Sequence, residues 1–348
     1  MADIEIRREG RAGRITLTRP QALNALSYEM CLAADRALKD WAHDPSVHLV
    51  MIDAEGSRAF CAGGDLGEMY ETGTAGNYRY GQTFWADEYR MNARVALYPK
   101  PVVSFLHGFT MGGGVGLGCH ASHRIVGESA QIAMPECTIG LIPDVGGTLL
   151  LSRAPGRLGA YLGTTGARMG PGDAIHAGFA SHFVPEADWA ALKAELVDCG
   201  SAQVIGKTAR PAPEATLARH LTEIDTWFSA GTLGEITKRV SAASNEFARA
   251  TQSVLKRVSP LAAACTLEIL RRYDSGTDIL SALSQEYRFT WRALEQSDFL
   301  EGIRAAIIDK DRSPRWRHAG ADEVSQHEVG AMLAPLGQHE LSFEEDHT

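Results

Sequence analysis

The sequence lacks the features that mark secreted, membrane-spanning and nucleic-acid-binding proteins. Its 348 residues contain no long uninterrupted apolar run, and the start, Met1 to Glu5, has no charged-then-apolar export signal. The six cysteines include no CxxC pair, so they indicate reduced, mostly buried thiols and not a disulfide framework. The formal net charge of −9 disfavours nucleic acid or an anionic membrane as a general partner. These absences predict a cytoplasmic protein that binds neither membrane nor nucleic acid.

The sequence also lacks internal repeats and low-complexity stretches, and its length suffices for one large core or two modest ones. Over residues 1–202, short apolar strands alternate with helical patterns, which predicts an α/β fold. The proline-containing segment 209–214 breaks this pattern, so we predict a linker at 203–216. A helical region is predicted at 217–336, and the polar, acidic stretch 337–348 is predicted to be frayed.

Apolar periodicity and capping signals predict the individual elements. Strands are expected at 4–8, 13–17, 49–53, 102–107, 124–127 and 181–184. Before the linker, helices are expected from the N-cap Ser27 to residue 42 and at 77–97, 113–120 and 186–199. After the linker, helices are expected at 217–229, 232–242, 247–257, 260–273 and 279–294.

Two glycine-rich turns each follow an apolar strand. Gly63-Gly64 comes after the strand at 49–53, and Gly112 to Gly114 comes after the strand at 102–107. Glycine leaves peptide N–H groups uncovered, and a helix that follows would point its positive end the same way, which favours an anion. Two such turns can each supply one N–H to a single carbonyl oxygen. For a single glycine run, a tight strand-to-helix turn is the ordinary alternative.

Two carboxylates eight positions apart, Glu136 and Asp144, each lie directly after a proline. Together with the glycine turns they can hold an oxyanion and move a proton. Both carboxylates could instead be helix caps, because Asp144 precedes an expected helix start near Gly146. A third carboxylate, Glu88, lies in the polar-aromatic segment 84–90, where a solvated surface glutamate is the alternative.

These motifs resemble the enoyl-CoA hydratase/isomerase (crotonase) superfamily over about residues 10–185, and within it the 3-hydroxyisobutyryl-CoA hydrolase branch. The positions that carry the resemblance are Arg19-Pro20, Asn24-Ala25-Leu26, Cys61 to Asp65 and Met111 to Gly114. The resemblance implies a β-β-α spiral core with a C-terminal helical region. It also implies that the N–H groups of Gly64 and Gly113 are oxyanion donors, and that the acyl-CoA substrate lies against Ala62, Gly63 and Gly112.

One departure from the family hydratases is informative. Hydratases carry two glutamates at the positions that here are Gly116 and Glu136, so one acid is missing. At the position of Asp144 hydratases usually have glycine, whereas the hydroxyacyl-CoA hydrolases have aspartate. Because syn addition of water to a double bond uses two acids on one face, the resemblance implies hydrolysis of a thioester instead. Attack by Glu136 through an anhydride and activation of water both stay open.

The implied substrate is a short, branched 3-hydroxyacyl-CoA thioester, above all 3-hydroxyisobutyryl-CoA of valine breakdown. The resemblance implies no metal and no redox cofactor, since CoA is part of the substrate. It places Glu88 near the substrate and the basic residues Arg19, Arg58 and Lys310 near CoA, although a solvated charge run is an equal alternative for Lys310. It further implies a homo-oligomer, a trimer or hexamer.

Other functions stay open on the sequence. One is an enoyl-CoA hydratase, dehydratase or isomerase that works through Glu136, and another is a non-catalytic scaffold of the same fold. The run Gly116 to Ala121 fits a dinucleotide-binding fingerprint, but it does not follow its strand directly and leaves Gly63-Gly64 unexplained. Cys119, His120 and His123 could be metal ligands, but residues so placed in an apolar helix and strand are more often packing and surface residues.

Overall fold

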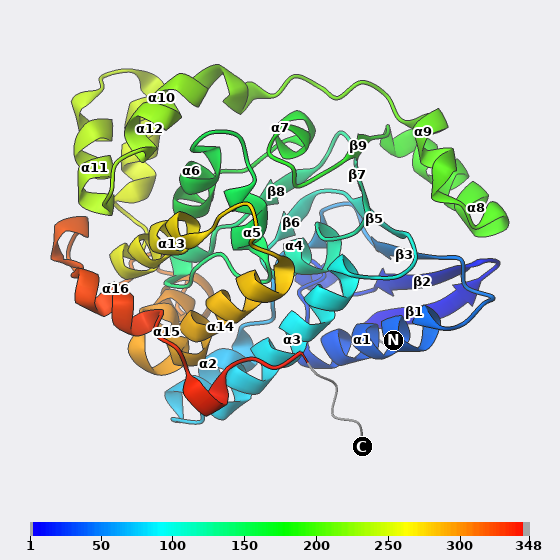
Figure 1. Cartoon of the computed structure of the whole chain (residues 1–348), viewed down its shortest axis with the longest axis horizontal. Helices are drawn as coiled ribbons and strands as arrows, with labels where there is room; N and C mark the ends of the chain where they lie inside the picture. Colours follow the sequence, from blue (N-terminus) through cyan, green and yellow to red (C-terminus); the bar gives the residue numbers. More distant parts are fainter. Residues whose placement is uncertain (1–2, 344–348) are drawn as a thin grey trace. The chain divides into compact units, whose positions relative to one another are not determined.

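The computed structural model describes residues 3–343 (Figure 1). The chain divides into two compact units that interleave along the sequence. Unit 1 comprises residues 1–65, 91–133 and 168–220, and unit 2 comprises residues 66–90, 134–167 and 221–348. The division predicted from the sequence is sequential, so its boundaries do not coincide with those of the two units.

Unit 1 is built on a six-stranded sheet with the order β1-β2-β3-β5-β7-β9. The first two strands form an antiparallel hairpin, and every later neighbour is parallel. The predicted hairpin and the four later predicted strands are thereby confirmed as elements of one sheet. The strands are β1 (Ile4–Glu9), β2 (Ala12–Leu17), β3 (Leu49–Ala54), β5 (Val102–Leu106), β7 (His123–Val126) and β9 (His182–Phe183).

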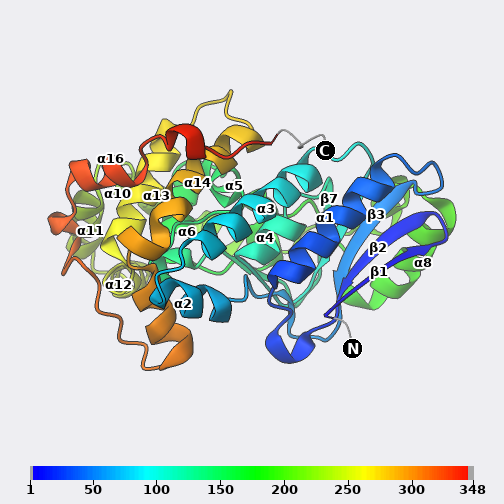
Figure 2. The same ribbon diagram turned by 90° about the horizontal axis from the view of Figure 1, so that it is seen from below.

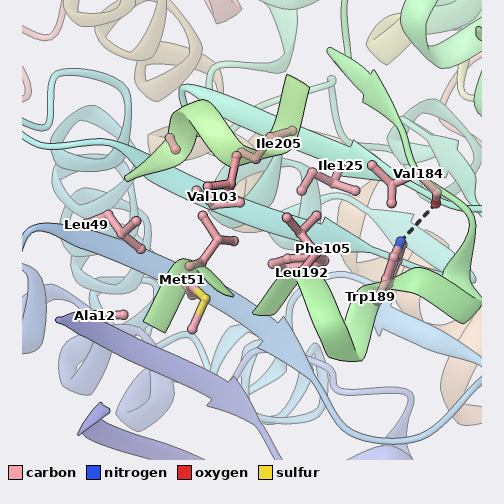
Figure 3. Packing of buried hydrophobic residues seen from close by; sticks show 13 residues of the cluster. Ala12, Leu49, Met51, Val103, Phe105, Ile125, Val184, Trp189, Leu192 and Ile205 are labelled. Atoms are coloured by element: carbon pink, nitrogen blue, oxygen red, sulfur yellow. Dashed lines mark hydrogen bonds between the residues drawn. The ribbon is translucent and has the colours of Figure 1, made fainter. Parts of the chain in front are cut away.

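One face of this sheet packs against α8 (Trp189–Cys199). Figure 3 shows strand residues such as Met51 and Phe105 packed against Trp189 and Leu192, all of them buried. The Trp189 indole N–H donates to the Val184 carbonyl (2.9 Å) and ties the helix to the sheet. Val204 and Ile205 lie in the segment predicted as a linker, yet both belong to the same core. Ile205 is the first residue of α9 (Ile205–Thr208).

The other face of the sheet packs against α1 (Tyr28–Ala42), and Figure 2 shows α1 and α8 on either side of β1, β2 and β3. A Cβ added at Gly13 of β2 would lie 2.4 Å from the Trp41 ring of α1. The Ser27 side chain accepts a hydrogen bond from the Met30 N–H and caps α1 as predicted. The buried face of this helix includes four residues at helical spacing: Cys31, Ala34, Leu38 and Trp41.

A second, three-stranded parallel sheet in unit 1 is not predicted by the sequence analysis. It contains β4 (Ala59–Cys61), β6 (Phe109–Met111) and β8 (Gln131–Ala133), in that order. Strands of three residues are too short to show an alternation of apolar and polar side chains. Both glycine-rich turns leave this sheet, one after β4 and one after β6. The other helices of unit 1 are α4 (Gly113–Gly118) and α7 (Pro171–His176).

Unit 2 is largely helical, as predicted for the C-terminal region. The long helix α3 (Arg79–Ala96) begins in unit 2 and ends in unit 1. Side-chain caps at Thr232, Asn245, Ser259 and Asp278 start four of the predicted helices. The helices of unit 2 are α2 (Gly67–Thr74), α5 (Gly147–Ser152), α6 (Leu158–Thr165), α10 (Leu221–Phe228), α11 (Leu233–Ala242), α12 (Glu246–Leu255), α13 (Pro260–Arg272), α14 (Ile279–Gln296), α15 (Phe299–Ile303) and α16 (Gln326–Met332).

The C-terminal stretch predicted to be frayed falls partly outside the described residues, since 344–348 are not among them. Within the described part, Glu340 pairs with Arg288 of α14 (Nε to Oε1, 3.0 Å). No helix among residues 3–343 is long and apolar enough to cross a membrane.

An ion-pair network fixes the middle of the six-stranded sheet. The carboxylate of Asp53 on β3 accepts hydrogen bonds from Arg14 (2.6 Å), Lys193 (2.7 Å) and Thr16 (2.8 Å). Burial acts to raise the pKa of Asp53, but Lys193 and Arg14 outweigh it and lower the pKa. The ionised carboxylate is therefore part of the native packing.

We expect Asp53→Asn to lower the free energy of unfolding by about 1.5–3 kcal/mol, because it removes charge-assisted hydrogen bonds from Arg14 and Lys193. Urea unfolding followed by circular dichroism measures this. A matched control is Lys39→Ala, which breaks the Lys39–Asp35 pair (3.1 Å) on α1 and should cost about 0.5 kcal/mol or less. Equal losses in the two variants would contradict a special role for the Asp53 network.

Candidate active site

The first glycine turn leaves the end of β4 and is held by Leu26. The Leu26 N–H donates to the Gly63 carbonyl, and the Asp65 N–H donates to the Leu26 carbonyl, both at 2.9 Å. These two bonds use backbone groups of Gly63 and Asp65, the residues on either side of Gly64. The Gly64 N–H takes no part in the pairing with Leu26. Ala62 is fixed in the same turn, because its N–H donates to the Leu23 carbonyl (3.0 Å).

The second glycine turn leaves β6 and opens α4. Gly112 has φ 48° and ψ −121°, a conformation that needs glycine. Gly113 is the first helical residue, and an N–H at that position has no acceptor within its helix. The helix starts close to β4, since a Cβ added at Gly114 would lie 2.3 Å from the Cys61 carbonyl oxygen.

The pairing of the short strands brings these two turns together. β4 and β6 are parallel neighbours, with Cys61 opposite Thr110. The carboxyl ends of parallel neighbours lie at the same edge of a sheet. The two N–H groups that the sequence predicts as oxyanion donors, those of Gly64 and Gly113, therefore follow strands that end at one edge. Backbone donors placed in this way are suited to stabilise a developing oxyanion.

Of the basic residues predicted to contact CoA, Arg19 has a structural partner. Its guanidinium donates to Asp65 (3.0 and 3.1 Å) and to the Ala25 carbonyl (3.2 Å), so it supports the first glycine turn. Arg58 in unit 1 is exposed. Lys310 in unit 2 is exposed as well, and it follows the helical turn at Arg304–Ile308 with φ 57°.

Unit 2 holds the three predicted carboxylates, and all three are buried: Glu88 is 3% exposed, and Glu136 and Asp144 are each 4% exposed. Glu88 on α3 is thus not a solvated surface glutamate. The caps of the two short helical segments nearby are Pro135 and Gly146, neither with a side-chain cap bond. Glu136 and Asp144 therefore do not cap these helices.

The environment of the three carboxylates disfavours their ionisation. Burial raises the pKa of Asp144 to about 7, although the Tyr89 hydroxyl opposes this by donating to its Oδ2 (2.8 Å). Burial, followed by repulsion from Asp144, raises the pKa values of Glu88 and Glu136 well above the ordinary range. Asp144 is thus close enough to both glutamates for their charges to interact.

Glu88 and Glu136 each keep one oxygen that is buried without a hydrogen-bond partner among the described residues, Oε1 in Glu88 and Oε2 in Glu136. Buried polar atoms are nearly always hydrogen-bonded in folded proteins. Two orphaned carboxyl oxygens next to Asp144 therefore indicate that polar groups of a bound molecule, or ordered water, complete the site.

Sequence reasoning gave no site role to a fourth buried carboxylate, Glu286 on α14, which is 0% exposed. It noted Glu286-Tyr287-Arg288 only as part of the resemblance of the helical tail to the hydrolase branch. Its oxygens accept from the N–H groups of Gly146 (2.7 Å) and Thr148 (3.0 Å), and burial raises its pKa to about 8. A signal for it was present, because Glu286 lies in a helical stripe of otherwise apolar and small residues: Ala282, Leu283, Thr290 and Ala293. A glutamate in such a stripe needs specific partners.

The structure also bears on two other readings of the sequence, a dinucleotide-binding turn and a metal site. Gly116 and Gly118 lie inside α4 and not in a strand-to-helix turn, so the dinucleotide fingerprint is excluded. Among residues 3–343 no group of three or more His, Cys, Asp or Glu side chains could hold a metal ion. Cys119, His120 and His123 are thus not such a group.

Comparisons with known proteins agree with the resemblance seen in the sequence. A family model described as enoyl-CoA hydratase/isomerase matches residues 12–333. The mitochondrial 3-hydroxyisobutyryl-CoA hydrolases of Gallus gallus and Bos taurus are 36% and 37% identical, and each alignment covers 98% of this chain and 91% of the relative.

Solved structures with similar folds carry other names. An enoyl-CoA hydratase from Rhodobacter sphaeroides 2.4.1 has a TM-score of 0.94 and 59% identity, over 98% of this chain and 100% of that one. A carnitinyl-CoA dehydratase from Mycobacterium thermoresistibile has a TM-score of 0.94 and 38% identity, over 99% of this chain and 100% of that one. The predicted fold is confirmed, and the chain belongs to the enoyl-CoA hydratase/isomerase (crotonase) family.

Proposed function

We propose that this protein hydrolyses a short, branched 3-hydroxyacyl-CoA thioester, with 3-hydroxyisobutyryl-CoA as the first candidate. The observation that carries the proposal is the pair of buried carboxylates Glu136 and Asp144, combined with glycine at position 116 inside α4. A glycine cannot supply the second acid that hydration of a double bond requires. The relatives named 3-hydroxyisobutyryl-CoA hydrolase support the same reaction.

In the proposed reaction, the N–H groups of Gly64 and Gly113 bind the thioester carbonyl oxygen and stabilise the oxyanion formed on it. One donor of this kind is worth about 2.7–4 kcal/mol in the transition state. A C–O bond forms at the carbonyl carbon, the C–S bond breaks, and CoA leaves as the thiol after taking a proton. In one route, Glu136 takes a proton from the attacking water. In the other, Glu136 attacks the carbonyl carbon itself and forms an anhydride, which water then hydrolyses.

Asp144 and Glu88 have different proposed duties. Asp144 orients the substrate 3-hydroxyl or the water, which fits a carboxyl whose pKa lies at about 7 and which can therefore act in either protonation state near neutral pH. Glu88 lies near the substrate and offers its unpartnered oxygen to a polar group. Ala62, Gly63 and Gly112 shape the two glycine turns against the acyl-CoA.

The second candidate is an enoyl-CoA hydratase or dehydratase. The names of the two solved structures with TM-scores of 0.94 favour it. It would have to work through Glu136 without an acid at position 116, and Asp144 would need to take over the missing part of the reaction.

The remaining expectations stay predictions: a role in valine breakdown, a cytoplasmic location, a homo-oligomer, CoA contacts from Arg19, Arg58 and Lys310, and chemistry without a metal or redox cofactor. The names of the two hydrolases above include the word mitochondrial. The location of this protein therefore needs an experiment of its own. A tagged chain followed by microscopy in its own host answers it.

The reaction class is tested by measuring thiol release from a panel of acyl-CoA esters beside hydration of crotonyl-CoA. We expect free CoA from 3-hydroxyisobutyryl-CoA, slower release from the ester without the 3-hydroxyl, and hydration slower by orders of magnitude because Gly116 replaces an acid. Fast hydration without thiol release would establish the second candidate instead.

We expect Glu136→Gln to lower kcat about 10²–10⁴-fold, since it removes the base or nucleophile. Calorimetry should show unchanged binding of a CoA ester, because the amide has nearly the same shape. Glu295→Gln, at an exposed position of α14, is the matched control and should behave like the wild type. Full turnover by Glu136→Gln would remove Glu136 from the mechanism.

The raised pKa of Asp144 predicts how stability depends on pH. Its value of about 7 in the folded protein lies above the ordinary value of about 3.9, so the folded state holds a proton that the unfolded chain has lost. This contribution to stability is fully present below about pH 4 and is lost as the pH rises through about 7. Asp144→Asn should therefore be more stable than the wild type at pH 8, and the difference should shrink at pH 5. Thermal unfolding at both pH values measures it, and a difference independent of pH would contradict the assignment.

A further inference from the structure

The loop that carries Asp144 has an unfavourable backbone conformation. Val145, the next residue, has φ 54°, and Gly146 has φ 79°, so the chain takes two left-handed steps in succession. A β-branched residue rarely adopts this conformation, because its Cβ crowds the backbone. Such a conformation persists only where the surrounding structure holds it, and it is characteristic of functional sites.

Glu286 of α14 supplies bonds that hold this loop. Its Oε2 accepts from the Gly146 N–H (2.7 Å), and its Oε1 accepts from the Thr148 N–H (3.0 Å) and from the Thr148 hydroxyl. The Thr148 hydroxyl is in turn 2.8 Å from the hydroxyl of Tyr273. Gly146 has no side-chain cap of its own, so a carboxylate 140 residues further along the chain takes that place.

The same helix also reaches the side chain of Asp144. One turn after Glu286, the hydroxyl of Thr290 lies 3.4 Å from that of Tyr89. Tyr89 donates to Asp144 Oδ2 (2.8 Å). α14 thus acts on Asp144 twice, through the backbone that follows it and through the tyrosine that holds its carboxylate.

We propose that Glu286 is a positioning residue for Asp144: by accepting the N–H groups of Gly146 and Thr148, it fixes the left-handed turn at Val145 and so sets the direction of the Asp144 carboxylate. The proposal rests on the proposed function insofar as Asp144 acts on the substrate. Its structural half, the clamp on the turn, is independent of which reaction the protein catalyses.

The role requires an acceptor at both oxygens of residue 286. In Glu286→Gln one oxygen becomes an NH₂ group, which would face a peptide N–H, so one of the two bonds must be lost while the volume stays the same. Tyr273→Phe is the matched control in the same contact chain, because it removes the outer hydroxyl and keeps both bonds from Glu286 to the backbone. The two variants separate loss of the clamp from loss of a nearby polar group.

The first measurement is hydrogen exchange of the amides of Gly146 and Thr148, read by mass spectrometry on a peptide that spans the loop. We expect Glu286→Gln to speed exchange at this segment about 10–100-fold, the range for leaving a buried peptide N–H without its acceptor. Tyr273→Phe should exchange like the wild type. Wild-type exchange in Glu286→Gln would overturn the clamp, whatever reaction the protein catalyses.

The second measurement is a double-mutant cycle on kcat, with the acyl-CoA ester that the wild type turns over. Glu286→Gln should lower kcat about 10²-fold with little change in KM, because a misplaced catalytic group costs about this much. In the Asp144→Asn background the same change should have little further effect, since Glu286 acts through Asp144. Equal losses in both backgrounds would show a merely structural cap and overturn the proposal.

Glu286→Asp carries the test if the glutamine variant does not fold. Its carboxylate is one methylene shorter and cannot reach both N–H groups, so kcat should fall in the wild-type background and not in the Asp144→Asn background. A protein that releases no thiol from any ester would refute the proposed function, and the exchange measurement would still decide on the clamp.

Discussion

The burial of four carboxyl groups is the constraint on which the candidate site in the helical unit depends. Glu88, Glu136, Asp144 and Glu286 are each at most 4% exposed, and the charge of Asp144 disfavours ionisation of the other three. Removing such groups from water costs several kcal/mol each unless hydrogen bonds compensate. Asp144 and Glu286 have such bonds, whereas Glu88 and Glu136 keep oxygens that are unsatisfied in the described part of the chain. Packing alone gives no reason for this difference, whereas polar groups of a bound molecule, or ordered water, would satisfy the two oxygens.

In unit 1, by contrast, the surroundings of the buried carboxylate Asp53 favour its ionised form. Asp53 has Arg14, Lys193 and Thr16 as hydrogen-bond partners, and Lys193 and Arg14 keep its pKa low. Unit 1 also contains the glycine turns at Gly64 and Gly113, whose peptide N–H groups follow short parallel strands that end at one edge of a sheet. Peptide donors cannot rotate away as side chains do, so an oxyanion stabilised by them needs little reorganisation during the reaction.

Elements that depend on residues close together in the sequence were predicted. Contacts between residues far apart in the sequence were not. Ser27 as a cap, the hairpin and the helices at 260–273 and 279–294 follow from local periodicity and capping. The three-residue strands around Cys61 were too short to show a period. Glu286 received no site role because its partners lie about 140 residues earlier. The bond from Arg19 to Asp65 joins two motifs that the sequence analysis treated separately.

Names of relatives do not decide between hydrolysis and hydration here. The chains that are 59% and 38% identical are called a hydratase and a dehydratase, whereas those that are 36% and 37% identical are called hydrolases. One fold supports both reactions, so the argument has to rest on particular side chains. Position 116 lies in α4 and carries no side chain at all, while Asp144 is buried, bonded to Tyr89 and held by a turn that Glu286 stabilises. The proposed hydrolysis of a hydroxyacyl thioester therefore rests on the Asp144 carboxylate, which a strained turn and a buried glutamate hold in place, and not on the names of relatives.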